Sequence, residues 1–400
     1  MVLLTLGIIT ARRIQVRVQK SRCMKIGRND KCWCRSGKKY KKCHLNRERE
    51  DPVETWEASA QLRKAFSIKL CSAPSIMHTD CSDLIVRAHT VPKSGSLGKI
   101  AEDGHVYAFT PTLESLIKYN GALRAQLVGV NRASAFTGFC STHDTKLFAP
   151  LELYDFAASQ EQCFLLAYRA YAREIYTKKA AAASAKVSAQ MDRGHPIEKQ
   201  LLVQSFSAVY NVGLNAALND IAHHQPRFDT LLLSGDFSTV RAYVVTFDSP
   251  PPVMCSGAFS PEQDFEGNLL QDLNDLSKVP SIISATSFYG GQYGHFVLVW
   301  LPDDDAVCVP FVKSLASIPD AELSSALVRF MFEFIENVHI SPAWWNSLSE
   351  SHRTALEARM LASANPAQGR RAGCLKPDEW PMGTWSVCDR NWIGVTPRIA

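Results

Sequence analysis

Cysteine and histidine, residue types that bind metal ions, are concentrated in two parts of this 400-residue chain. In the first part, Cys32 and Cys34 are separated by one residue, and Cys43 and His44 follow after eight more. Four such ligands within thirteen residues suit a closed tetrahedral Zn²⁺ site. A segment this short cannot bury a hydrophobic core, so we expect the metal to supply its folding energy. With four protein ligands, the ion would have no open position for catalysis.

The segment around this first cluster is strongly basic. Residues 27–44 contain seven lysines and arginines, and residues 1–49 contain fifteen against two acidic residues. The remainder of the chain is acidic, so the positive charge belongs to the head end. This charge distribution predicts an acidic partner such as nucleic acid or the ribosome, although a solvated charged tail has the same composition. The lysines beside the cysteines also favour the thiolate forms that bind zinc.

The sequence GRNDKCWCRSGKKYKKCH, residues 27–44, closely resembles the SEC-C motif, named for the zinc-binding tail of the bacterial preprotein translocase motor. The usual pattern is G-R-N-D-P-C-P-C-G-S-G-K-K-Y-K-x-C-C/H. This chain departs from it at Lys31, Trp33 and Arg35, none of which is a ligand. The motif is an accessory that docks proteins or ribosomes, so the resemblance implies contact rather than chemistry. It implies zinc bound by Cys32, Cys34, Cys43 and His44.

A second group of potential ligands follows at Cys71, Cys81, Cys140 and His143. Two Cys/His pairs around a strand that carries a histidine resemble the treble-clef, ββα-metal arrangement of HNH nucleases. The resemblance implies that these four residues bind structural zinc. It also implies that His89 is the general base that activates water toward a phosphodiester, and that Asp144 binds a catalytic Mg²⁺ or Mn²⁺ ion.

The chain departs from the HNH pattern in three places. Ala88 stands where the family commonly has an aspartate, nine residues separate the first two cysteines, and the gap from His89 to Cys140 is long. His105 is a candidate substitute ligand from the second strand of the hairpin. Three basic residues are candidates for stabilising phosphate charge: Arg87, Lys93 and Lys146. The alternative is a zinc-stabilised fold in which His89 only forms hydrogen bonds in the core.

The hydrophobic pattern predicts an α+β fold with a mixed or antiparallel sheet. Apolar residues at helical spacing predict helices within 54–70, 151–224, 321–337 and 339–360. Runs rich in β-branched and aromatic residues predict strands over 239–247, 252–259, 280–289, 294–301 and 306–312. The tail after residue 362 is predicted to be loop.

These patterns divide the chain into six expected regions. They are a leader that is not native if Met24 is the true start (1–23), the SEC-C zinc module (24–50), the HNH-like zinc domain (51–150), a helical segment (151–227), an α+β domain (228–362) and a loop-rich tail (363–400).

Composition limits the location of the protein. The apolar opening precedes its arginines, which is the reverse of the order in a secretory signal. We find no run of about eighteen apolar residues, so we expect no membrane span. The unevenly spaced cysteines do not suggest a secreted disulfide framework, and a reducing cytoplasm is expected.

Three functions follow from these observations. The first is a metal-dependent HNH-like nuclease that acts on DNA or RNA in stress or phage defence. The second is a non-enzymatic zinc-stabilised protein that binds nucleic acid or ribosomes, and the third is an adaptor whose C-terminal half binds a protein partner. The expected metals are Zn²⁺ at one or two structural sites, with Mg²⁺ or Mn²⁺ for the nuclease.

Overall fold

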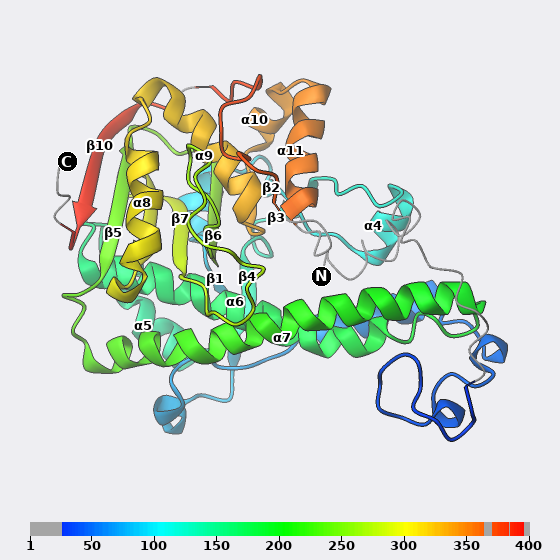
Figure 1. The fold of residues 1–400 in the computed structure, drawn as a ribbon. Helices are drawn as coiled ribbons and strands as arrows, with labels where there is room; N and C mark the ends of the chain where they lie inside the picture. The colour runs from blue at the N-terminus through cyan, green and yellow to red at the C-terminus, as the bar shows by residue number, and fades with distance from the viewer. Residues whose placement is uncertain (1–25, 364–369, 384, 396–400) are drawn as a thin grey trace.

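The computed structural model of the protein describes residues 26–363, 370–383 and 385–395. The predicted leader and the Met24 start lie outside the described residues. Helices and strands are mixed along the chain, which confirms the α+β prediction (Figure 1). The division into six regions stays a prediction.

Eight strands form one antiparallel sheet in the order β10-β5-β8-β7-β6-β9-β2-β3 (Figure 1). Their bounds are β2 His105–Ala108, β3 Gln126–Gly129, β5 Arg241–Phe247, β6 Val253–Phe259, β7 Ile283–Gly290, β8 Tyr293–Trp300, β9 Val338–Ile340 and β10 Val387–Ile393. Successive side chains enter opposite cores: Tyr243 and Val245 lie in one, and Ala242 and Val244 in the other. Burial on both faces explains why the central strands β5, β6, β7 and β8 read as largely apolar runs.

Helices pack on both faces of this sheet. One core contains residues of the helices that follow β8, which are α8 Asp305–Ala316, α9 Asp320–Phe334, α10 Pro342–Ser347 and α11 Glu350–Ser363. The other core contains the N-terminal half of α6 Gln160–Ser188, where every residue from Gln162 to Ala172 is buried. α6 and α7 Ile197–Ser234 form a long helical hairpin, which confirms the predicted helical middle and extends it to Ser234 (Figure 1).

A separate two-stranded sheet carries the second Cys/His group. β1 Ile85–His89 pairs antiparallel with β4 Ala135–Cys140, and α5 Ser141–Glu152 begins directly after β4. This unit packs against α6, where Phe139 and Phe148 share a core with Phe164. The remaining elements are η1 Tyr40–Lys42, η2 Arg47–Arg49, α2 Thr55–Phe66, η3 Ser75–Asp80, η4 Lys93–Leu97, α3 Gly98–Ile100, α4 Leu113–Lys118 and η5 Pro302–Asp304.

The structure corrects two predicted elements. Residues 306–312 belong to helix α8 and not to a strand. Its buried side chains recur at Cys308, Phe311, Val312 and Leu315, a helical period that the almost wholly apolar run conceals. The tail is not all loop, because β10 pairs with β5 at the sheet edge.

Among the described residues, α7 is long and apolar enough to cross a membrane by length and composition alone. Core helices pass the same test, so this is weak evidence for a span. The helix also carries Asp220, His224 and Arg227.

Candidate metal centres

The first Cys/His group converges on one point. The ligand atoms of Cys32, Cys34, Cys43 and His44 lie within 4.8 Å of one another. Nδ1 of His44 is 3.2 Å from the Sγ atoms of both Cys32 and Cys43, and the Sγ atoms of Cys34 and Cys43 are 3.4 Å apart. A tetrahedral zinc ion holds such donor atoms about 3.5–3.8 Å apart, given bonds of about 2.3 Å to sulfur and about 2.0 Å to nitrogen. The four donors therefore fit one zinc ion after a small expansion.

Non-ligand residues of the motif shape this turn. Asp30 accepts a hydrogen bond from the backbone N–H of Gly27 at 2.8 Å, and the N–H of Cys32 donates to the carbonyl of Lys38 at 2.8 Å. Gly37 has a φ of +74°, a conformation that favours glycine, at the point where the chain reverses. The reversal brings Cys43 back to the first two cysteines.

The thiols of this group differ in acidity. Burial raises the pKa of Cys32 to about 12. Burial acts in the same direction on Cys34, but hydrogen bonds with Ser36 and with the neighbouring thiols lower the pKa of Cys34 to about 7. Neighbouring thiolates repel one another, so a divalent cation is needed for all three sulfurs to ionise together.

A residue that the sequence did not suggest completes this centre from outside. Nε2 of His44 donates to Oδ2 of Asp192 at 2.7 Å, and Asp192 lies in the turn between α6 and α7. The zinc module, blue in Figure 1, therefore lies at the end of the helical hairpin. No local pattern marks Asp192, because 148 positions separate it from its partner.

The second Cys/His group also converges. Nδ1 of His143 lies 3.5, 3.4 and 3.2 Å from the Sγ atoms of Cys71, Cys81 and Cys140. All four ligand atoms lie within 4.8 Å of one another, so they too could hold zinc. Burial raises the pKa of Cys81 to about 12, whereas for Cys140 hydrogen bonds with His143 and Ser82 outweigh burial and lower the pKa to about 6.

Local structure places each ligand of this second group. Cys81 follows the 3₁₀ helix η3, which fills the long gap after Cys71. Cys140 ends β4 and caps α5, and its sulfur accepts from the backbone N–H of His143 in the first helical turn. A loop, an antiparallel strand pair and a helix that together carry four ligands have the arrangement expected of a treble clef.

His105 does not belong to this unit. It lies in β2, which pairs with β3 and β9 of the large sheet, whereas the partner strand of β1 is β4. The long gap between His89 and Cys140 is filled by β2, α4 and β3. The ring of His105 is exposed, and its Nδ1 donates to the carbonyl of Asp103 at 2.7 Å.

His89 ends β1, as the HNH hypothesis requires. Its Nε2 is buried and has no hydrogen-bond partner in the part of the chain that the structure describes. Burial lowers the pKa of His89, and the positive charges of Lys93 and Arg169 lower it further. The imidazole is therefore neutral near pH 7, the form that a general base needs.

Asp144 faces a buried cation that the protein itself supplies. NH2 of Arg169, on α6, lies 2.7 Å from Oε1 of Glu152 and 3.9 Å from Oδ1 of Asp144. NH1 of the same guanidinium donates to the backbone carbonyl of His89 at 3.2 Å, and the guanidinium carbon lies 3.8 Å from the ring centroid of Phe148. Burial raises the pKa of Asp144, although the charge of Arg169 opposes this.

This arrangement does not fit a divalent cation at Asp144. The two groups of metal-ligating side chains found in the described residues do not include Asp144 or His89. A guanidinium already lies beside the carboxylate that would bind Mg²⁺ or Mn²⁺. The three residues predicted to stabilise phosphate, Arg87, Lys93 and Lys146, are exposed at the surface.

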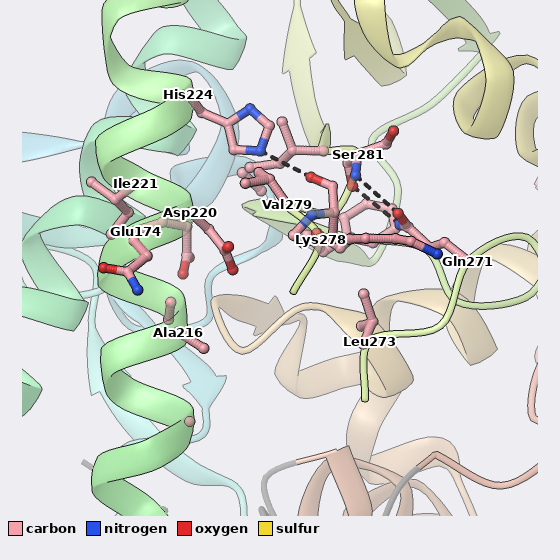
Figure 2. Close-up of a pocket in the computed structure, with 18 of the residues that line it drawn as sticks. Glu174, Ala216, Asp220, Ile221, His224, Gln271, Leu273, Lys278, Val279 and Ser281 are labelled. Carbon is pink, nitrogen blue, oxygen red and sulfur yellow. Dashed lines mark hydrogen bonds between the residues drawn. The ribbon is translucent and has the colours of Figure 1, made fainter. Parts of the chain in front are cut away.

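Sequence reasoning also missed a cavity of about 890 Å³ between α6, α7 and the loop over 270–282 (Figure 2). His224 donates from Nε2 to the carbonyl of Pro280 at 2.9 Å, and Gln271 is hydrogen-bonded to the backbone of Ser281. Charges of both signs line the cavity, including Glu174 and Lys278, so its charge selects no ligand class.

Comparison with known proteins identifies one part of the chain. The SEC-C motif family matches residues 28–46, which confirms the resemblance found in the sequence, and the match does not reach the second Cys/His group. No curated protein and no solved structure matches the chain. The four converging donors agree with the zinc site of that motif. The chain is therefore a zinc-binding α+β protein that carries a SEC-C motif at residues 28–46.

Proposed function

We propose that this protein is a non-enzymatic, zinc-stabilised nucleic-acid-binding protein that makes contact through its basic head, residues 26–50. One observation carries the proposal: the head lies at the end of the α6–α7 hairpin (Figure 1), and eight of its basic side chains are exposed to solvent. The exposed basic residues are Arg28, Lys31, Arg35, Lys38, Lys39, Lys41, Lys42 and Arg49.

Phosphate recognition is the chemistry that suits this surface. Lysine and arginine contacts with phosphates release counterions, which gives strong binding at low salt and steep weakening as salt rises. The three acidic residues of the head, Asp30, Glu48 and Glu50, are outnumbered by nine lysines and arginines, so the surface stays positive. None of the eleven described cysteines is joined in a disulfide, which supports a proposed location in the reducing cytoplasm.

The test is the salt dependence of binding to duplex DNA and to RNA. A head variant replaces Lys38, Lys39, Lys41 and Lys42 with glutamine, and a matched variant replaces four exposed lysines of the body, Lys69, Lys118, Lys313 and Lys376. The head variant should lower the slope of log K against log salt on duplex DNA by up to about 3.6, since each lost phosphate contact contributes about 0.9. The body variant should keep the full slope, and both should keep their zinc.

Equal slopes for the two variants would reject the head as the contact surface. Binding of a protein partner that changes little with salt, with no nucleic-acid binding, would favour the adaptor function instead.

The HNH-like nuclease remains a second candidate because of the strand–strand–helix unit and because His89 is neutral and its buried Nε2 has no hydrogen-bond partner among the described residues. The guanidinium of Arg169 beside Asp144 weighs against a catalytic cation. Plasmid, single-stranded DNA and RNA incubated with Mg²⁺ or Mn²⁺ should stay intact with both wild type and His89→Ala. Cleavage by wild type alone, with unchanged zinc content in the variant, would establish the nuclease.

A further inference from the structure

We infer that Asp192 is a positioning residue of the SEC-C zinc site, and that it joins zinc binding to the fixing of the head on the helical hairpin. The carboxylate is fully buried, and Nε2 of His44 donates to its Oδ2 at 2.7 Å. Donation from Nε2 leaves the lone pair of the imidazole on Nδ1, the atom that faces the sulfurs of Cys32 and Cys43. Asp192 therefore selects the tautomer that can bind the metal.

The carboxylate is itself held in one orientation. Nε of Arg47 donates to Oδ1 at 2.7 Å, and Nε2 of Gln204 donates to Oδ2 at 2.7 Å. Both oxygens are thus occupied by partners from the head and from α7. A carboxylate with this support orients the histidine ring and increases its basicity toward the metal.

The second centre offers an internal contrast. Nε2 of His143 is buried and has no hydrogen-bond partner among the residues that the structure describes. Only the first of the two centres therefore has a carboxylate behind its histidine, and that carboxylate comes from the body of the protein. The zinc affinity of the head should consequently depend on Asp192, a residue outside the motif.

Two further contacts fix the head beside Asp192 without touching the ligands. The backbone N–H of Gly194 donates to the carbonyl of Arg47 at 3.0 Å, and Nε of Arg193 donates to the carbonyl of Asp51 at 2.7 Å. Arg193→Ala is therefore the matched control, because it loosens the same turn and leaves the pair of Asp192 and His44 in place.

The test measures zinc affinity of the full chain by competition with a coloured chelator, together with hydrogen exchange of residues 27–50. Asp192→Asn should lower the affinity for one of the two zinc ions by about 10- to 100-fold, as is typical when the hydrogen-bond partner of a metal-bound histidine is lost. Exchange should rise in the head and stay unchanged around Cys140. Arg193→Ala should change the affinity by less than about threefold.

A second test, in the His44→Cys variant, distinguishes an effect of Asp192 on the zinc ligand from an effect on the attachment of the head to the hairpin. In His44→Cys the ligand has no second nitrogen, so Asp192 has nothing to orient. If the inference is right, adding Asp192→Asn to His44→Cys causes no further loss of zinc. An equal loss in both backgrounds, or no loss in the wild-type background, would overturn the inference. This test is independent of whether the head binds nucleic acid.

Discussion

Replacing Arg169 with methionine should destabilise the unit formed by β1, β4 and α5. The side chain is 4% exposed, and its guanidinium pairs with Glu152, approaches Asp144 and donates to the carbonyl of His89. Methionine keeps a long unbranched side chain beside Phe148 but removes the charge and the cation–π contact of the guanidinium with that ring. Removing one partner of a buried ion pair costs about 3–5 kcal/mol. Glu152 is 47% exposed and can regain water, so we expect a value near the lower end, about 3 kcal/mol.

The expected cost has a specific source that a second substitution can isolate. Oδ1 of Asp144 is buried, so its charge is left uncompensated once the guanidinium is gone. Asp144→Asn removes that charge while keeping the shape. The double variant should therefore be more stable than Arg169→Met alone, by about 1–2 kcal/mol.

The assay should report on this unit directly. Native-state hydrogen exchange of peptides from 85–152 gives the free energy of local opening of this unit. Tryptophan fluorescence is less suitable, because several tryptophans, such as Trp300 and Trp345, lie in the other core. Arg63→Met is the control, because Arg63 pairs with Glu114 at 3.4 Å and both side chains are more than half exposed, so its loss should cost less than about 1 kcal/mol. A cost below about 1 kcal/mol for Arg169→Met, or strictly additive effects in the double variant, would refute the reasoning.

Two further predictions concern pH and metal. Burial lowers the pKa of His339 to about 3, so the folded protein keeps this ring neutral while the unfolded chain takes up a proton below about pH 6.5. The free energy of unfolding should therefore fall by about 1.4 kcal/mol per pH unit from this group as pH drops below 6.5. His339→Gln, which keeps a donor for Asn337, should flatten that slope in urea titrations at pH 5 and 7, and an unchanged slope would contradict the assignment. Metal analysis should find two zinc ions per chain, and a strong chelator should raise hydrogen exchange around Cys32 and around Cys140; one zinc ion, or protection that survives chelation, would contradict the two-centre structure.

Local information made the first zinc centre predictable. All four ligands lie within thirteen residues, and the turn between them uses Gly37, so the motif specifies its own geometry. The second group was predictable although 72 positions separate Cys71 from His143, because cysteine and histidine in such numbers point to metal wherever they stand.

The missing parts depend on contacts between distant positions. Arg169 lies on α6 and Asp192 in the turn between α6 and α7, and neither carries a sign in the sequence of its distant partners. Residues 306–312 were wrongly predicted to form a strand, because an almost uniformly apolar run shows neither the helical nor the strand period. Strand β10 was missed because Asp389, Arg390 and Asn391 make its sequence polar. It lies at the edge of the sheet, where backbone pairing with β5 forms the strand without an apolar sequence pattern.

The distance along the chain between His44 and Asp192 also sets an order of events during synthesis. The head has all its zinc ligands once His44 has left the ribosome, but Asp192 comes 148 residues later. At roughly 5–20 residues per second this interval is about 7–30 s. The head can therefore acquire its metal as a separate, tethered unit and is fixed to the body only when the turn between α6 and α7 has been made.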